Sequence, residues 1–184
     1  MNPVTLWTSR LRLRELEAGD WPAVYAYRSD ALVKRYERFF EPNIEREVRE
    51  LLRRAVEDRQ QEPRLRYHFG VILCESERLI GECALLRIRR TLDEAVVGWM
   101  LHRDYWRQGI GTETGRALLR FGFETLGLRR IQADCSPDNI ASWRLMEKIG
   151  MQRVEDEDTS ALDTLCRYEY AISAEQYQRL PPIP

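Results

Sequence analysis

A glycine-containing turn is the part of this sequence best suited to bind an anion. It comprises residues 108–112 (Gln-Gly-Ile-Gly-Thr) and follows a nearly unbroken apolar run that ends at Leu101. The residues after the turn have helical character, and the first N–H groups of a helix carry partial positive charge and have no intrahelical acceptor. Such groups can hold a phosphate, and we expect Gly111 to approach it so closely that no side chain would fit.

Three interpretations of this turn compete. A P-loop has a lysine between its last glycine and the Ser or Thr that follows, whereas Thr112 follows Gly111 directly. The dinucleotide fingerprint Gly-x-Gly-x-x-Gly requires a third glycine where Thr114 stands, and Gly115 comes one residue late. The third interpretation is a structural turn that only begins a helix, and the turn alone leaves this open.

A second polar motif follows about 28 residues later. Asn139 is a natural N-cap for a helix that runs through Lys148 and is stopped by Gly150. Ser142 lies one turn into that helix and faces the same way as Asn139. The two side chains could serve one ligand, or they could be a helix cap and a solvated serine.

The hydrophobic pattern predicts the elements that must position these motifs. Strands are expected over residues 11–16, 66–73, 79–88, 95–101, 130–135, 152–155 and 165–172. Helices are expected over residues 21–27, 44–55, 112–126 and 140–148, with Asp20 and Asn43 capping the first two. The strands run together early and then alternate with helices, so we expect a mixed α/β domain with a partly parallel centre.

Taken in order, these segments resemble the GNAT superfamily of acyl-CoA N-acyltransferases, and most closely its branch of ribosomal-protein N-terminal acetyltransferases (the RimJ/RimL type). The resemblance rests on a Gly98-Trp99 strand that runs into Tyr105-Trp106, on the turn, on the Asn-x-x-Ser…Glu-Lys-x-Gly helix and on the opening residues 9–14. It covers nearly the whole chain. Trp106 replaces the Arg or Gln of the commoner turn, and an aromatic residue there is typical of this branch.

The resemblance implies an α/β GNAT fold, in which a mixed central sheet has a splayed parallel strand pair and flanking helices. The pantetheine arm of acetyl-CoA would lie in the gap between the splayed strands, where one backbone N–H would polarise the thioester carbonyl. The turn would hold the pyrophosphate. The residues that the resemblance assigns to acetyl-CoA are Met100, Leu101, His102, Arg107, Gln108, Gly109, Ile110, Gly111, Thr112, Asn139 and Ser142.

The same resemblance implies direct transfer of the acetyl group in a ternary complex. Ser142 would protonate the departing thiolate, because Met146 stands where many members of the superfamily have a tyrosine for this task. The attacking amine must be neutral, so a general base is needed. Glu82, Glu94 and His102 are the candidates, and the sequence does not choose among them.

Two further features have weaker functional interpretations. Cys135 could suggest a covalent acyl-cysteine, but nothing in the sequence activates it, and we interpret it as a core residue. Phe39 and Phe40 precede Pro42 in a loop and are the expected acceptor contacts within an aromatic N-terminal region.

Charge and composition exclude several classes of protein. The chain has 29 Lys and Arg against 30 Asp and Glu, which argues against nucleic acid as the main partner. Its four cysteines are far apart and it has only two histidines, so we expect neither a metal site nor a disulfide framework. No apolar run approaches the ~18 residues of a membrane span. We therefore expect a cytoplasmic protein with no membrane partner.

These observations combine into one prediction. Residues 1–180 form a single acetyltransferase domain, and residues 181–184 form a short C-terminal arm. The protein moves an acetyl group from acetyl-CoA, without a metal, to a primary amine. A protein or peptide N-terminus is the first choice, and a polyamine, amino-acid derivative or drug is the second. A non-catalytic acyl-CoA-binding module and a nucleotide-binding protein are the rival interpretations, and a homodimer is left open.

Overall fold

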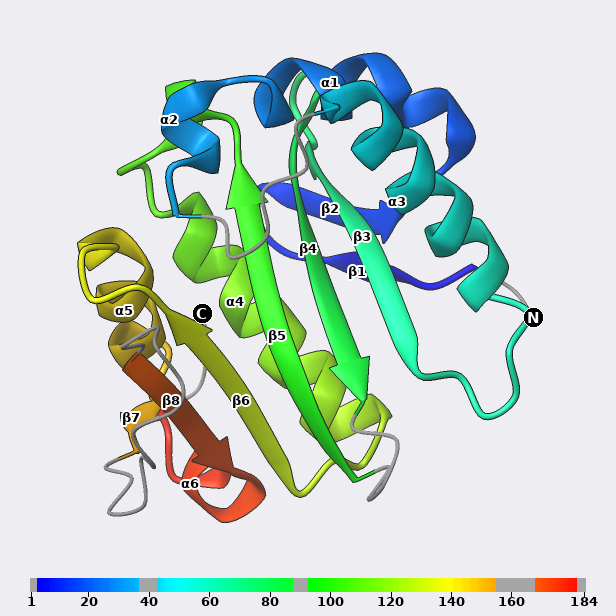
Figure 1. Ribbon diagram of the computed structural model, residues 1–184. Coiled ribbons are helices and arrows are strands. Elements are labelled where there is room, and N and C mark those ends of the chain that lie inside the picture. The colour runs from blue at the N-terminus through cyan, green and yellow to red at the C-terminus, as the bar shows by residue number, and fades with distance from the viewer. Residues whose placement is uncertain (1–2, 37–42, 88–92, 155–167, 182–184) are drawn as a thin grey trace, which may run out of the picture.

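An eight-stranded sheet organises the residues that the computed structural model describes, which are 3–36, 43–87, 93–154 and 168–181. Its strands lie in the order β1-β2-β3-β4-β5-β6-β8-β7 (Figure 1). Their bounds are β1 Thr5–Trp7, β2 Leu11–Glu15, β3 Arg66–Leu73, β4 Leu79–Arg87, β5 Glu94–Leu101, β6 Arg130–Cys135, β7 Gln152–Arg153 and β8 Tyr168–Ser173. Only β5 and β6 pair in parallel, so the prediction of a mixed sheet with a partly parallel centre is confirmed.

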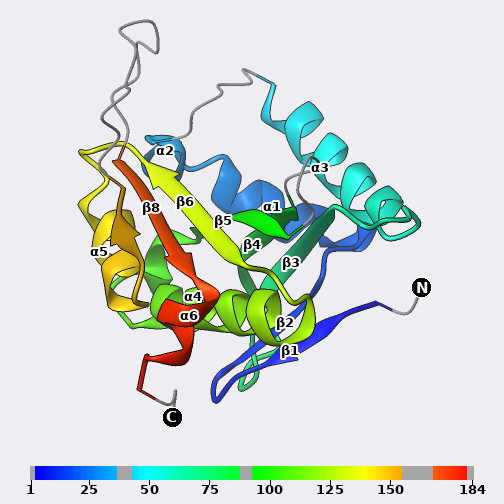
Figure 2. The same ribbon diagram turned by 90° about the horizontal axis from the view of Figure 1, so that it is seen from below.

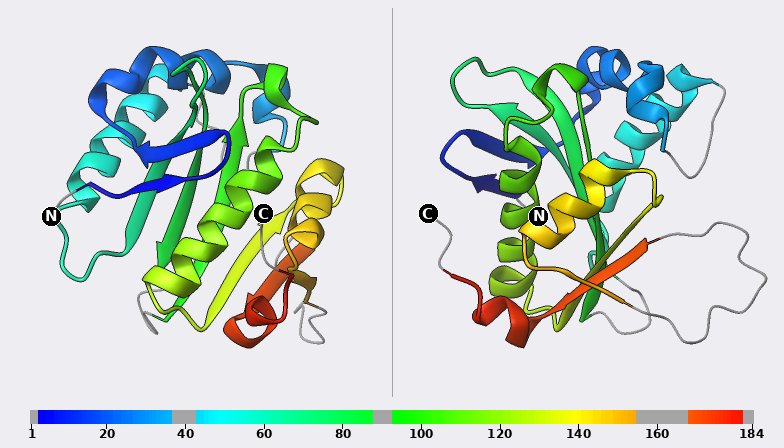
Figure 3. Two further views of the ribbon diagram at one scale, coloured as in Figure 1. Left: turned by 180° about the vertical axis from the view of Figure 1, so that it is seen from behind. Right: turned by 90° about the vertical axis from the view of Figure 1, so that its left-hand side faces the viewer.

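Helices cover the two faces of this sheet. Figure 2 and Figure 3 show α1 and α3 on one face and α4 and α5 on the other. The helices are α1 Trp21–Arg28, α2 Ala31–Lys34, α3 Ile44–Asp58, α4 Ile110–Arg120, α5 Ile140–Lys148 and α6 Ala174–Gln178. A short π-helical turn, Phe121–Thr125, continues α4. In Figure 1 no described helix lies over the near face of β6 and β8.

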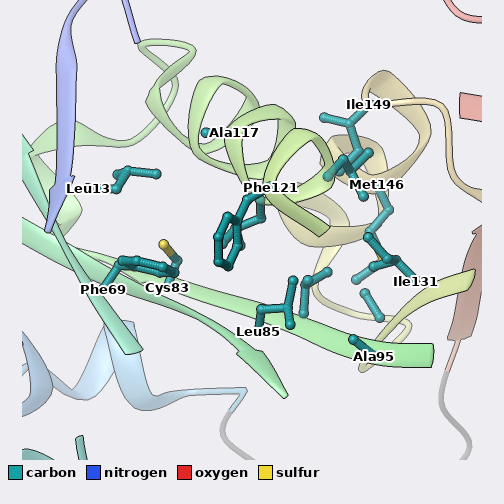
Figure 4. Close-up of a cluster of buried hydrophobic side chains, with 14 of the residues drawn as sticks. Leu13, Phe69, Cys83, Leu85, Ala95, Ala117, Phe121, Ile131, Met146 and Ile149 are labelled. Carbon is teal, nitrogen blue, oxygen red and sulfur yellow. The ribbon is translucent and has the colours of Figure 1, made fainter. Parts of the chain in front are cut away.

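Two apolar cores hold these layers together because the strands alternate their side chains between the two faces. The larger core lies between the sheet and the helices α4 and α5, and includes Phe69, Leu85, Phe121, Ile131 and Met146 (Figure 4). The smaller core lies under α1 and α3 and includes Leu16, Val24, Tyr27, Val48, Leu52, Ala55 and Met100. Residues 99 and 101 of β5 therefore face α4, whereas residue 100 faces α1 and α3.

The strands β5 and β6 pair over only part of their length. Their register joins Glu94 to Arg130 and continues through Val96 and Gln132, where it ends. β5 continues for five residues beyond this point and remains paired with β4 on its other side. β5 and β6 diverge in Figure 1 toward the ends that lead into the turn and α5. The described part of the chain thus contains the splayed pair that the sequence resemblance implies.

Most predicted elements are present, and the differences have physical causes. β1 and α2 were not predicted because elements of three and four residues are too short to show a period. The helix predicted over residues 112–126 begins two residues earlier and changes to π geometry at Phe121. Asp20 precedes α1 without capping it, because its carboxylate binds the Glu17 amide and Arg14. Parts of the last two predicted strands, and residues 182–184 of the arm, lie outside the described residues.

Candidate active site

The turn before α4 presents a row of backbone donors. Within the described part of the chain, no hydrogen-bond acceptor is recorded for the amide N–H groups of residues 108–112, and the first amide bonded into the helix is that of Glu113, to Gly109. Gly109 has φ +79° and Arg107 has φ +60°, so two residues in the left-handed region bend the backbone into the start of the helix. Five consecutive N–H groups at a helix N-terminus are suited to an anion with several oxygens.

Side chains at both ends hold the turn in this shape. The indole Nε1 of Trp106 donates to the carbonyl of Leu101 at 2.8 Å, and the side-chain amide of Gln108 donates to the carbonyl of Asp104 at 2.8 Å. Trp106 therefore binds the end of β5, which explains why an aromatic residue with an N–H group precedes this turn. The side chain of Arg107 is exposed beside it.

The edge of β5 that faces the gap has its own backbone donors. The amide of His102 donates to Ile80 of β4 at 2.8 Å, and successive residues of a strand direct their N–H groups to opposite edges. The N–H groups of Trp99 and Leu101 are therefore directed to the gap, and that of Met100 to β4. Of the three residues predicted to bind pantetheine through the backbone, Leu101 has the N–H group that faces the gap, whereas the N–H groups of Met100 and His102 face β4.

The helix α5 brings the second motif to the same end of the sheet. The side-chain oxygen of Asn139 accepts from the amide of Ser142 at 3.2 Å, so the predicted N-cap is confirmed. Ser142 is partly buried, and no partner for its hydroxyl is recorded among the described residues. α5 follows β6 directly, and α4 follows β5 through the turn, so the two helices flank the diverging strand ends (Figure 3).

Gly111 has a packing contact that the sequence did not indicate. A Cβ atom at this position would lie 2.6 Å from Cδ1 of Leu145, and one at Gly115 would lie 3.0 Å from Ile149. The missing side chains allow α4 and α5 to pack closely, and they do not open onto the row of amides. Helix packing thus gives one reason for a glycine at position 111, and its amide also belongs to the row.

On the opposite face of the sheet, β4 carries a buried carboxylate. Glu82 accepts a hydrogen bond from the hydroxyl of Tyr27 at 2.8 Å and forms an ion pair with Arg28. Arg28 in turn pairs with Glu47, which also binds Lys34. Burial, and then the negative charge of Glu82, raise the pKa of Tyr27 well above its ordinary value of 10.0. Tyr27 therefore acts as a donor to Glu82 at neutral pH.

The three candidate bases lie in different places. Glu82 is paired in register with Met100, on the part of β5 that has parted from β6. Glu94 lies where β5 and β6 are still paired, seven residues or about 23 Å from Leu101. The imidazole of His102 lies beside the turn, where its Nδ1 accepts from the amide of Asp104 at 3.3 Å. The structure thus brings Glu82, and not Glu94, to the level of the open strand edge.

An ionic contact at the turn was missed by the sequence analysis. The hairpin between β1 and β2 reaches Glu113 in the first turn of α4, where Arg10 Nε donates at 2.8 Å and Thr8 Oγ1 at 2.6 Å. Burial raises the pKa of Glu113, but the hydrogen bonds from Thr8 and Arg10 and the charge of Arg10 outweigh it and hold this pKa below 4.5. Over a separation of 103 residues, no local pattern could have indicated the pair.

The other predicted residues lie in the core or outside the described part of the chain. Cys135 is buried in the larger core at the end of β6. Phe39 and Phe40 lie outside the described residues. Among the residues that are described, no three His, Cys, Asp or Glu side chains are grouped so that they could hold a metal ion. The described helices include none with the length and apolar character needed to cross a bilayer.

Comparisons with known proteins match this arrangement. The family model described as an acetyltransferase (GNAT) domain matches residues 10–152. The uncharacterized N-acetyltransferase YnaD of Bacillus subtilis (strain 168) is 35% identical over 150 residues, which cover 79% of this chain and 81% of that protein. The crystal structure of a GNAT-family acetyltransferase from Bacillus anthracis has a TM-score of 0.73 and 29% identity, covering 94% of this chain and 99% of that one.

Two more distant structures share the fold. Mycobacterium smegmatis RimJ in complex with CoA-disulfide has a TM-score of 0.75 at 18% identity, over 96% of this chain and 91% of that one. A ribosomal-protein-S5-alanine acetyltransferase from Vibrio fischeri has a TM-score of 0.74 at 16% identity, over 95% of this chain and 98% of that one. At these identities, the likeness extends to the arrangement of strands and helices.

Proposed function

Since the chain belongs to the GNAT family of acetyl-CoA-dependent N-acetyltransferases, we propose that its acceptor is the N-terminal amine of a protein or peptide. The acetyl group passes directly from acetyl-CoA to this amine. The observation that carries the proposal is the end of the β5–β6 pairing at Val96 and Gln132, beside a sheet face that no described helix covers.

The donor side of the site fits acetyl-CoA. The row of amides at residues 108–112 supplies N–H groups for the pyrophosphate, with Arg107 adding positive charge nearby. The amide of Leu101 would donate to the thioester carbonyl, which becomes more negative as the amine attacks. Asn139 would use its side-chain NH₂ group for pantetheine, because its oxygen is occupied by the helix cap.

Proton transfer is divided between the two faces of the sheet. We assign the acid role to Ser142, whose hydroxyl would protonate the departing thiolate. Glu82 is the preferred base, acting directly or through water on the attacking amine. Each of its oxygens accepts one hydrogen bond, from Tyr27 or from Arg28, and a carboxylate oxygen can accept a second.

The acceptor side supports a chain terminus over a small enclosed amine. Gly98 of β5 is exposed, and a Cβ atom there would have no neighbour within 4 Å. Its register partner Ala84 is also small and only partly buried. The surface of the sheet close to Glu82 therefore has only small residues at these two positions. The name of the Vibrio fischeri structure gives a ribosomal protein as the acceptor of that enzyme, which agrees with a protein acceptor here. A free polyamine or amino-acid derivative remains the second candidate.

The test is a panel of acceptors with coenzyme A release as the readout. Peptides with a free N-terminus should be acetylated, and mass spectrometry should locate the acetyl group on the terminal nitrogen. The matched control is the same peptides with a blocked N-terminus and a free lysine. Faster turnover of polyamines or amino-acid derivatives than of any peptide would move the assignment to a small amine. Saturable acetyl-CoA binding without turnover on the whole panel would favour a non-catalytic module.

A further inference from the structure

The hairpin between β1 and β2 binds the carboxylate of Glu113 at the start of α4. Oε1 of Glu113 accepts from the hydroxyl of Thr8 at 2.6 Å, the backbone amide of Arg10 at 3.0 Å and the hydroxyl of Ser9 at 3.2 Å. Oε2 accepts from Nε of Arg10 at 2.8 Å and lies 2.7 Å from its Nη2. Both oxygens are thus bound by three successive residues that lie about 100 positions earlier in the chain.

The guanidinium of Arg10 reaches past Glu113 to the turn itself. Its Nη1 donates to the carbonyl of Gln108 at 3.1 Å, and its Nη2 lies 3.4 Å from where a Cβ atom of Gly109 would be. The side chain is 49% exposed, whereas that of Glu113 is 15% exposed. The negatively charged member of the pair is therefore mostly buried, and the positively charged member is exposed next to the row of amides.

Arg10 offsets an unfavourable negative charge at the turn. A bare carboxylate in the first turn of α4 would repel any phosphate held by the amides of residues 108–112. Arg10 cancels that charge, and its planar guanidinium is held at three points, so little side-chain entropy remains to be lost when it meets an anion. Guanidinium groups also bind phosphate oxygens more strongly than neutral donors do.

We propose that Arg10 binds the pyrophosphate of the acetyl donor and that Glu113 is the residue that positions it. The inference rests on the proposed function in one respect, namely that the turn holds the phosphates of coenzyme A. It adds a binding residue from the β1–β2 hairpin and gives the hairpin a role in donor recognition.

The test compares three ligands that differ in their phosphates, by calorimetry for coenzyme A and dephospho-coenzyme A and by ligand-observed NMR for pantetheine. Arg10→Gln should weaken coenzyme A and dephospho-coenzyme A about tenfold each and leave pantetheine unchanged. The loss should shrink in 0.5 M salt, because the contact is partly exposed and therefore screened. Arg12→Gln is the matched control, since Arg12 lies on β2, pairs with Glu77 and carries the same charge.

Two further variants keep the result interpretable. Arg10→Lys keeps the charge but loses the Nε donor, so we expect a two- to threefold loss, and it replaces Arg10→Gln if that variant does not fold. Glu113→Gln should also weaken coenzyme A, although it removes a negative charge near the phosphates, because Arg10 loses its anchor. A stronger binding of coenzyme A by Glu113→Gln would overturn the positioning role.

The proposal is overturned if Arg10→Gln and Arg10→Lys bind coenzyme A like the parent, or if Arg10→Gln weakens pantetheine as much as coenzyme A. Loss of coenzyme A binding alone, with dephospho-coenzyme A unaffected, would assign Arg10 to the 3′-phosphate and overturn the pyrophosphate contact. None of these measurements needs an acceptor. Failure to acetylate peptides would therefore refute the proposed acceptor but would not change what the binding measurements say about Arg10.

Discussion

The two faces of the sheet meet at the gap between β5 and β6 but are built from different groups. On the face of α4 and α5, the proposed functional groups are backbone amides at the turn and the cap of a short helix. On the face of α1 and α3, they are the buried side chains of Tyr27, Arg28 and Glu82. In the proposed function, the first face would bind acetyl-CoA mainly through backbone N–H groups, and the second would act on the amine through charges buried by the helices above them. We call the first the donor face and the second the acceptor face.

This difference determines how each face responds to mutation. A backbone donor remains when its side chain is changed, so the donor face should be sensitive to packing and helix position. A buried carboxylate has no such protection, because its replacement removes the acceptor of the Tyr27 hydroxyl and one of the two carboxylates that pair with Arg28. Substitutions on the acceptor face should therefore act on turnover, and those on the donor face on affinity and stability.

The largest effect is expected from Glu82→Gln. If Glu82 is the base, turnover should fall at least about 100-fold, because a positioned base contributes about 100- to 10,000-fold. The affinity for acetyl-CoA should not change, since Glu82 lies on the other face of the sheet. Steady-state kinetics and calorimetry measure the two quantities.

Glu94→Gln is the matched control for that change, because Glu94 also faces away from α4 but lies on the paired part of β5. It should turn over like the parent. Equal losses in both variants, or none in Glu82→Gln, would remove Glu82 as the base and return His102 or water to consideration.

The second prediction concerns packing on the donor face. Gly111→Val should destabilise the protein by about 1–3 kcal/mol, because the new side chain would overlap Leu145 of α5. Leu145→Ala should recover part of this loss in the double variant, since it removes the atom that clashes. Urea unfolding of the four proteins gives the coupling energy. Additive effects would show that Gly111 is not limited by α5 and would favour the original expectation of a close phosphate.

The contrast between the faces also explains what the sequence could and could not predict. Local patterns of a few residues were sufficient to predict the turn, the strands that flank it and the cap at Asn139. The ion pair between Arg28 and Glu82 spans 54 residues, and that between Arg10 and Glu113 spans 103. Which residues form such pairs depends on the order in which distant strands lie side by side, and the periodicity of a single sequence does not reveal that order. The contact that limits Gly111 was not predicted for the same reason, because Leu145 is on another helix.

A third, smaller effect is expected from Ser142→Ala. Turnover should fall about tenfold, since coenzyme A is already a fair leaving group and needs only part of the help that an acid can give. Acetyl-CoA affinity should be nearly intact. Asn139→Ala should instead raise the Michaelis constant for acetyl-CoA and cost about 1 kcal/mol of stability, because its oxygen caps α5. Unchanged turnover in Ser142→Ala would assign the acid role to water.

The smallest expected effect is a pH-dependent change in stability caused by Glu113. It tests whether the contacts of Glu113 with the β1–β2 hairpin, which we call the hairpin clamp, stabilise the fold as well as the site. The folded-state pKa of Glu113 lies below the ordinary 4.5, so its contribution to stability is complete above that value and is lost as the pH falls through the folded pKa. Glu113→Gln should therefore be less stable than the parent by about 1 kcal/mol at pH 7, since the charge-assisted hydrogen bonds become neutral ones. As the pH falls from 4.5 through the lower folded-state pKa of Glu113, the difference should close, because the parent then also carries an uncharged side chain at this position. Arg12→Gln, which removes an exposed ion pair with Glu77 on the same hairpin, should differ little from the parent at either pH. A gap between parent and Glu113→Gln that stays constant from pH 7 to pH 3 would mean that the ionised form of Glu113 adds nothing to the clamp. The hydroxyl of Thr8 and the backbone amide of Arg10 would then hold the hairpin to α4.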